Sequence, residues 1–121
     1  MPLHTIFAEE GSTSGKTKAK IAVEITRVHA EVMKELRACH VSFYGMGRGY
    51  TAGEKAATAA VNCVLRDGHS AQEKNDMLKR IWSMFQQLTG VATEQLAISL
   101  QEIPASNALE MGQIMPAVEQ A

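Results

Sequence analysis

The strongest constraint on the fold is an internal repeat, because the chain reads twice as strand, helix and strand. Shifting the sequence by 56 positions superposes the two units across strand, turn, helix and strand, in pattern more than in identity. The superposed pairs are Pro2 with Thr58, Ser14 with Ser70, Lys18 with Lys74, Ile21 with Met77, Ile25 with Ile81, Val28 with Met84 and Ser42 with Ile98. We therefore interpret the chain as a duplicated β-α-β unit, with repeats at about 2–44 and 57–102 and a C-terminal tail.

Hydrophobic periodicity predicts the elements of each repeat. The predicted strands occupy 3–8, 40–44, 57–65 and 95–103, and the predicted helices 16–36 and 71–88. The side chain of Ser70 is placed to cap the second helix. The glycine-rich stretch 45–55 predicts a loop, and the stretch after Ile103 predicts a short helical turn followed by a loose tail.

A duplicated unit of this kind determines the layers of the fold. Each β-α-β crossover is right-handed, so two units that share one sheet place both helices on the same face. The sequence therefore predicts a single α+β domain over 1–121, with a four-stranded sheet and two helices on one face. The other face of the sheet is left uncovered, and apolar residues there favour an oligomer.

Composition excludes several classes of protein. A net charge of −1 over 121 residues argues against a nucleic-acid partner, which normally selects a basic surplus. No apolar run reaches the ~20 residues of a membrane span, and we expect no secretory signal. Cys39 and Cys63 are too few for a disulfide framework and lack zinc-site spacing, so we expect a cytoplasmic protein without metal or cofactor.

One motif resembles a phosphate-binding loop without satisfying it. The stretch "GSTSGKT" lies between a predicted strand and a predicted helix, but the P-loop requires a glycine five residues before Gly15. That position is Glu10, a carboxylate that would repel phosphate. A polar turn and a helix N-terminus explain these residues, so we do not predict nucleotide hydrolysis.

Pro2 stands at the start of the first predicted strand, directly after Met1. Proline lacks the N–H that a ladder requires but is tolerated at the first position of a strand. One interpretation is therefore an ordinary strand start. The alternative is that Met1 is removed, which would leave Pro2 with a secondary amine whose pKa its surroundings can tune.

Three segments resemble the tautomerase superfamily, and within it the cis-3-chloroacrylic acid dehalogenase group. "ITRVHAEV" carries His29 at the position of that group's active-site histidine. "LRDGHSAQEK" resembles its "LHREGRSADLK" and carries Arg66. "EIPASNALEMGQIMP" resembles its "EMPAQQMVEYGRFLP" and carries Glu110. The resemblance covers roughly residues 2–116 and implies a tautomerase/MIF-like fold.

The resemblance implies catalytic roles for four residues and changes at two more. The catalytic proline falls on Pro2, and the histidine, first arginine and glutamate fall on His29, Arg66 and Glu110. The group's second arginine is His69 here, which with Arg66 forms the expected substrate-binding pair. Its active-site tyrosine falls on Ser99, which puts hydrolytic dehalogenation in doubt more than simple proton transfer.

The resemblance therefore implies a cofactor-free tautomerase that acts on a small carboxylate substrate, a 2-oxo acid or its enol, and assembles as a homotrimer. Two alternatives remain open. One is the dehalogenase or hydratase activity of the group, and the other is a non-catalytic binding module that keeps the fold.

Each proposed site residue also has a structural interpretation. His29 borders the apolar stripe of its helix and suits a satisfied interfacial histidine. Arg66 stands beside Asp67 and suits a surface ion pair. Glu110, on a short polar helix, would be exposed to solvent, and His69 suits an ordinary turn residue.

Overall fold

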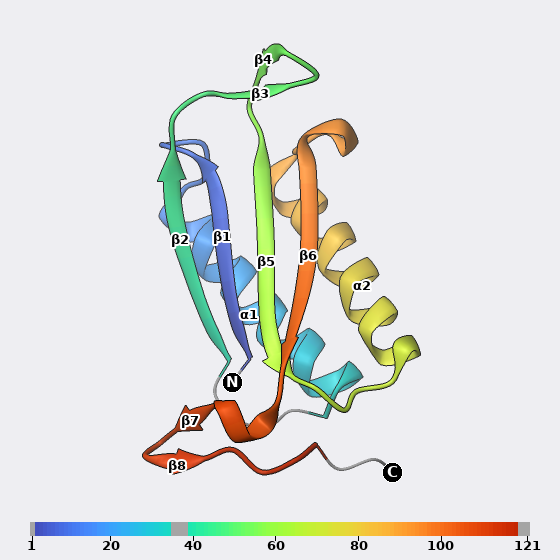
Figure 1. The fold of residues 1–121 in the computed structure, drawn as a ribbon. Coiled ribbons are helices and arrows are strands. Elements are labelled where there is room, and N and C mark those ends of the chain that lie inside the picture. The colour runs from blue at the N-terminus through green and yellow to red at the C-terminus, as the bar shows by residue number, and fades with distance from the viewer. Residues whose placement is uncertain (1, 35–38, 119–121) are drawn as a thin grey trace.

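The computed structural model describes residues 2–34 and 39–118. It has one four-stranded sheet of order β2-β1-β5-β6, with both long helices on the same face (Figure 1). The elements are β1 (Leu3–Glu9), α1 (Gly15–Val32), β2 (His40–Met46), β5 (Ala59–Arg66), α2 (Ala71–Thr89) and β6 (Leu96–Ile103). The predicted α+β fold with two β-α-β units is confirmed.

The pairing of the strands places two strand ends at the site of interest. Within each unit the strands are parallel, β1 with β2 and β5 with β6, whereas β1 and β5 are antiparallel. The start of β1 therefore lies beside the end of β5. We call this end of the sheet the proline end, and the opposite end, where β5 begins, the distal end (Figure 1).

The helices bury equivalent positions at the predicted shift of 56. In α1 the buried residues include Ile21, Ile25 and His29. In α2 they are Met77, Ile81 and Phe85. These side chains pack on the sheet and form the main core, so the apolar stripes predicted from the sequence are correct, and His29 corresponds to Phe85.

The strands overlay at a shift of 57, so the pairs predicted at 56 are wrong there. Side chains alternate between the two faces of a strand. Ile6 of β1 faces the helices, as Cys63 does in β5. The turn from β1 to the N-cap of α1 is one residue longer than the turn from β5 to the N-cap of α2. Pro2 therefore corresponds to Ala59, whereas Thr58 was predicted.

The same one-residue difference affects β2 and β6. Ser42 is exposed on the face away from the helices, whereas Ile98 packs against the main core. The predicted superposition of Ser42 on Ile98 is therefore wrong, and Val41, which packs against the core, is the equivalent of Ile98.

Helix α1 ends earlier than predicted, at Val32 rather than near Leu36. The backbone N–H of Met33 donates to the carbonyl oxygen of His29, and Lys34 adopts a φ of 53°. A left-handed residue ends a helix because it turns the backbone away from the helical path. The predicted last residues, 35 and 36, lie outside the described residues.

The glycine-rich stretch contains a hairpin where a loop was predicted. It comprises β3 (Gly49–Thr51) and β4 (Glu54–Ala56), joined by Ala52 and Gly53 with φ values of 51° and 83°. Two consecutive positive φ values characterise the type I′ turn that suits the twist of a hairpin. The hairpin lies at the distal end of the sheet (Figure 1).

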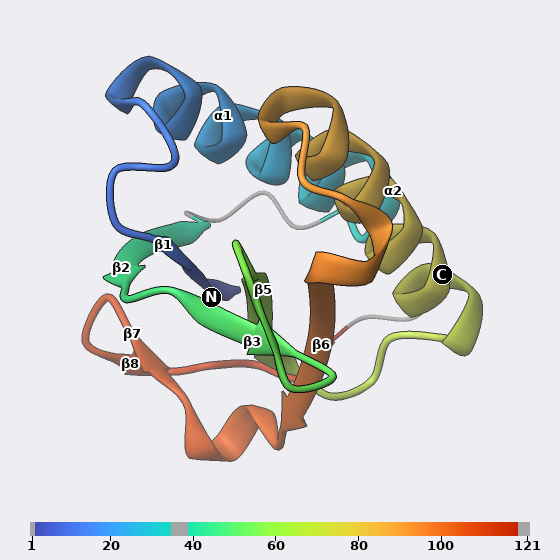
Figure 2. The same cartoon turned by 90° about the horizontal axis from the view of Figure 1, so that it is seen from above.

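The C-terminal segment also contains a hairpin that was predicted as helical. Only Ala105–Asn107 forms a 3₁₀ turn; β7 (Leu109–Glu110) and β8 (Gln113–Ile114) then pair as a short hairpin. Glu110 is accordingly on a strand and half-buried, not on a polar helix. Figures 1 and 2 show this segment at the proline end, on the side of the sheet away from the helices.

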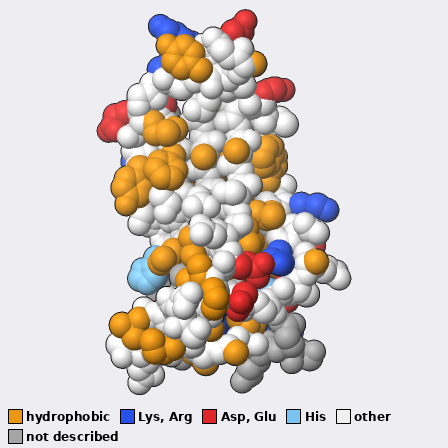
Figure 3. Space-filling view, in the orientation of Figure 1, with side chains coloured by type: hydrophobic (Ala, Val, Ile, Leu, Met, Phe, Trp, Pro, Cys, Tyr) orange, Lys and Arg blue, Asp and Glu red, His pale blue; other side chains and the backbone are white. Residues whose placement is uncertain are grey.

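The face of the sheet away from the helices is covered at one end only. There Ala108 and Met115 of the C-terminal segment are buried against Val64 and Ile103. Farther along the face, Phe7 stacks on Tyr44, whose side chain is 55% exposed. Figure 3 shows hydrophobic side chains on this face. Within the described residues no helix is long and apolar enough to cross a membrane.

Candidate active site

Pro2 lies at the proline end, immediately before β1, and its side chain is among the fully buried ones. Its carbonyl oxygen accepts a hydrogen bond from the backbone N–H of His40, at 3.0 Å. The β1–β2 register pairs Leu3 with His40, so Cys39 lies beside Pro2 at the start of the ladder. Pro2 therefore adopts the strand-start position that the sequence predicted.

His29 approaches the same end from α1. The helix runs antiparallel to β1, so its last turn lies over the strand's first residues (Figure 1). There the Nε2 atoms of His29 and His4 lie 2.5 Å apart, and both side chains are 1% exposed. His4 is two residues after Pro2 on the same face of β1, so His29 contacts the strand directly beside the proline.

Burial determines the charge state of His4. Burial and, to a smaller extent, the nearby His29 lower the pKa of His4 to about 3. His4 is therefore neutral at physiological pH. One Nε2 of the pair carries a proton and donates it to the other, since two N–H groups cannot face each other at this distance.

Arg66 lies at the same end of the sheet but is directed to the other side. It ends β5, and its Nη1 donates to the carbonyl oxygen of Pro116 at 2.6 Å. The side chain is only 8% exposed because the C-terminal segment covers it. The surface ion pair considered for Arg66 does not describe this buried position, since the guanidinium binds the C-terminal segment.

The remaining predicted residues surround the proline end. His69 is buried in the turn after β5, and its Nδ1 lies 4.0 Å from Oε1 of Glu73 in the first turn of α2. Glu110 lies on β7, below the end of the sheet. Ser99, in the position of the group's tyrosine, lies on the uncovered face, where its hydroxyl donates to Oδ1 of Asn62 at 2.9 Å.

The structure thus gathers the five predicted residues at one end of the sheet and divides them between two sides. On the helix side, His29 contacts His4, which follows Pro2 by two residues along the chain. Arg66 and Glu110 belong to the side of the C-terminal segment. A proline, two imidazoles and a guanidinium therefore lie around one end of the sheet, on its two sides.

Sequence reasoning missed His4 and Cys39. The signal for His4 was present in the sequence. His4 lies two residues before Ile6 in β1, so both side chains point to the same, core-facing side of the sheet. A polar residue in such a position requires a partner. Cys39 carried no signal, because its place beside Pro2 depends on the β1–β2 register.

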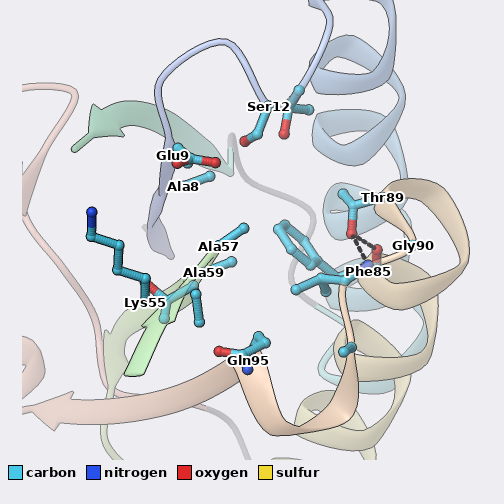
Figure 4. A pocket seen from close by; sticks show the side chains of 15 residues that line it. Ala8, Glu9, Ser12, Lys55, Ala57, Ala59, Phe85, Thr89, Gly90 and Gln95 are labelled. Atoms are coloured by element: carbon cyan, nitrogen blue, oxygen red, sulfur yellow. Dashed lines mark hydrogen bonds between the residues drawn. The ribbon is translucent and has the colours of Figure 1, made fainter. Parts of the chain in front are cut away.

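A cavity of about 460 Å³ lies at the distal end, far from Pro2 (Figure 4). Phe85 and Ala59 point into it, with Glu9, Lys55 and Gln95 around its rim (Figure 4). Phe85 and Ala59 are the equivalents of His29 and Pro2 in the second unit. The cavity is therefore the counterpart of the proline end, with apolar side chains where the proline end has a proline and a histidine.

Comparisons with solved structures find the same fold. A member of the cis-3-chloroacrylic acid dehalogenase (cis-CaaD) family is 24% identical, with a TM-score of 0.89 over 96% of this chain and 85% of that one. Pt0534, inactivated by 2-oxo-3-pentynoate, is 19% identical, with a TM-score of 0.82 over 93% and 94%. A fused 4-OT symmetric trimer is 16% identical, with a TM-score of 0.84 over 93% and 94%.

No protein-family model matches the chain, and no curated protein matches it in sequence. The structural neighbours include cis-CaaD family members and 4-OT, which are tautomerase-superfamily proteins. The fold implied by the resemblance of the three sequence segments is therefore confirmed. The structure extends the likeness from those segments to nearly the whole chain.

Proposed function

We propose that this chain is a cofactor-free tautomerase that interconverts the enol and keto forms of a 2-oxo acid, with Pro2 as its acid–base group. The observation that carries this proposal is the position of Pro2. It is buried at the start of β1, beside a histidine pair that includes His29. Strand β1 also begins next to the end of β5, which finishes at Arg66.

The chemistry requires one group that accepts and returns a proton near neutral pH. Removal of Met1 would give Pro2 a secondary amine, and an α-amine titrates near ~8 before perturbation. Burial disfavours the ammonium form and lowers the pKa of such an amine. In ketonisation the neutral amine takes the proton of the enol hydroxyl. The resulting ammonium then delivers a proton to the neighbouring carbon as the carbonyl forms.

The other residues bind and orient the substrate in this proposal. Arg66 pairs with the carboxylate, since a guanidinium presents five donors and can hold both Pro116 and a substrate. His29 donates a hydrogen bond to a substrate oxygen, and its partner His4 fixes the tautomer that does so. Glu110 tunes the pKa of the Pro2 amine or orients a water, and His69 supports the carboxylate site.

Hydration or dehalogenation is the second candidate, favoured by the structural likeness to the cis-CaaD family. Ser99 cannot act as a phenol, and its hydroxyl is engaged with Asn62. The double substitution Ser99→Tyr with His69→Arg restores the group's residues. If it raises hydration of an acrylate or propiolate above the parent's rate, the two departures account for a reduced activity in the parent.

The uncovered sheet face supports a homotrimer. Half-buried Phe7 stacks there on exposed Tyr44, and Leu3 is 40% exposed. Figure 3 shows hydrophobic side chains on this face. Apolar surface of this kind is stabilised by burial against another subunit. The fused 4-OT neighbours are trimers, and light scattering in solution should give three times the chain mass of 13.1 kDa.

Ultraviolet-monitored ketonisation of phenylenolpyruvate and 2-hydroxymuconate tests the activity. We expect turnover by the purified protein, abolished in Pro2→Ala although the variant folds. The intact mass should show that Met1 is absent. Retention of Met1 in an active protein, or equal rates for the parent and Pro2→Ala, would exclude Pro2 as the acid–base group.

A second probe labels the amine directly. The electrophile 2-oxo-3-pentynoate inactivated Pt0534, and an unprotonated amine can add to its activated triple bond. We propose the same compound as a label for Pro2. An adduct forms only if the amine is both free and deprotonated, so labelling reports the two conditions that turnover requires.

A further inference from the structure

Three side chains that are far apart in the sequence converge beside Pro2. They are His4 of β1, His29 of α1 and Cys39 at the start of β2. Their ligating atoms all lie within 4.8 Å of one another. Among the described residues, these three were found as a group that could hold a metal ion. Their separation in sequence explains why spacing gave no indication of a metal site.

The fold fixes each member of this group independently. His4 points toward the helices because it lies two residues before Ile6 and shares its face of β1. His29 reaches it from the last turn of α1, and the ring centroids are 4.8 Å apart at an interplanar angle of 66°. Cys39 is placed by the hydrogen bond from His40 to Pro2 at the start of the β1–β2 ladder. Strand register and helix packing therefore preorganise the three ligands.

The donor set has a definite chemical preference. We propose that His4, His29 and Cys39 form a binding site for a thiophilic metal ion of the Zn²⁺ class, next to the proposed acid–base proline. Two imidazoles and one thiolate are a frequent zinc donor set, and three protein ligands leave a fourth position for water or a ligand oxygen. Cys39 is half-buried whereas both histidines are buried, so the thiol side provides access.

The geometry needs a small adjustment. With Zn–N bonds of about 2.0 Å and tetrahedral angles, two ligating nitrogens lie roughly 3.3 Å apart. The two Nε2 atoms are 2.5 Å apart, so entry of the ion separates the rings by less than ~1 Å. The proton between the rings must leave Nε2. Nδ1 of His4 is buried and has no hydrogen-bond partner among the described residues, so it can take that proton by tautomerisation.

The proton balance gives the proposal a further signature. The thiol of Cys39 must lose its proton to bind the ion, and that proton passes to the buffer. Each ion bound therefore releases one proton, and affinity falls as the solution becomes more acidic. A metal held by His29 also removes the group that the proposed tautomerase uses on its substrate. Zn²⁺ should therefore inhibit turnover, a consequence that rests on the proposed function.

Titration of the metal-free full chain with Co²⁺ tests the site without reference to activity. We expect one equivalent of Co²⁺ per chain, with the intense thiolate charge-transfer absorption and the d–d bands of a four-coordinate ion, and displacement by Zn²⁺. Cys39→Ser should remove the charge-transfer band, and His4→Gln should weaken binding by roughly 100-fold. His40→Gln, at an exposed histidine next to Cys39, is the matched control and should bind like the parent.

The spectrum of the parent protein decides the proposal even if a variant fails to fold, because the charge-transfer band reports the thiolate directly. A spectrum without that band, or equal loss of binding in His40→Gln, would overturn the proposal. If the chain binds Co²⁺ but does not turn over enols, the metal-site proposal stands and the proposed tautomerase activity is rejected. If the chain turns over enols, Zn²⁺ does not inhibit this turnover and the titration shows no binding of Co²⁺, the metal-site proposal alone is rejected.

Discussion

The two β-α-β units share one architecture, and their equivalent positions lie at opposite ends of the sheet because β1 and β5 are antiparallel. At the proline end, the first unit contributes the buried pair of His4 and His29. At the distal end, the second unit contributes Phe85, which points into a cavity (Figure 4). The equivalent residues are Pro2 and Ala59, His4 and Val61, and His29 and Phe85. The two ends of the sheet therefore differ at three equivalent side chains on a common scaffold.

This difference has an energetic cost. Burial of an imidazole without a hydrogen-bond partner is unfavourable, whereas a buried phenyl ring gains free energy from leaving water. The first unit compensates by pairing His4 with His29. A pair of mutually dependent polar residues in a core is retained at the expense of stability, which is characteristic of a functional site.

The largest expected effect concerns what the two units share. Ile25 and Ile81 are equivalent and both completely buried, so truncation to alanine removes similar packing in each unit. We expect Ile25→Ala and Ile81→Ala each to lower the free energy of unfolding by about 2–5 kcal/mol. Urea unfolding measures both. A cost confined to one variant would show that the cores of the two units are not equivalent.

The second prediction converts the proline end into a copy of the distal end. His29→Phe alone leaves His4 buried without its partner and should cost about 1–3 kcal/mol of stability. Adding His4→Val should recover most of that loss while turnover stays reduced by roughly 10²–10³-fold. Phe85→Leu is the matched control, expected to lower stability and keep turnover. Full activity of the double variant would show that the histidine pair does not take part in turnover.

The third prediction compares the helix N-termini. Ser70 accepts from the backbone N–H of Glu73, and the Glu73 carboxylate accepts from the backbone N–H of Ser70. The Ser14 hydroxyl accepts from the backbone N–H of Thr17 and donates to the Thr17 hydroxyl, so this cap has no carboxylate that returns a hydrogen bond to the N-cap backbone. Ser70→Ala should therefore cost about 1 kcal/mol and Ser14→Ala less. Thermal melts of the two variants give the order, and equal costs would contradict it.

The smallest effect is the pH dependence of that capping box. Hydrogen bonding to the backbone N–H of Ser70 lowers the pKa of Glu73 below its ordinary value of 4.5. The carboxylate therefore contributes stability above about pH 4.5 that is lost as the pH falls through its folded pKa. Because Glu73 is largely exposed, the contribution is a few tenths of a kcal/mol. Glu73→Gln should flatten the acid limb of the stability curve, and an unchanged limb would contradict this assignment.

The helices could be predicted from the sequence because their signals are local. Apolar periodicity and the Ser70 cap specify α2 nearly to the residue, and the same periodicity located the face that carries His29. The hairpin at 49–56 was missed because its turn places Ala52 at a positive φ. An alanine in the sequence gives no indication of such a backbone conformation. The end of α1 was missed for the same reason at Lys34.

The candidate site was predicted in composition and not in arrangement. His29 lies beside the start of β1 through its contact with His4, and the division of the site depends on contacts that join distant segments. Arg66 points to the C-terminal side because Pro116 accepts its hydrogen bond. The role of His4 as the partner of His29 follows only from the packing of helix α1 on strand β1. Such contacts have no signature in residue type or spacing.

The proposed tautomerase requires Pro2 to be a free, deprotonated amine, and one measurement tests this most directly. The full chain is incubated with 2-oxo-3-pentynoate at neutral pH, and the modified peptide is located by mass spectrometry. We predict one adduct per chain, on the N-terminal amine of Pro2, with loss of turnover in proportion to labelling. An adduct on Cys39 or on Lys55 beside the distal cavity, with Pro2 unmodified, would contradict the central claim.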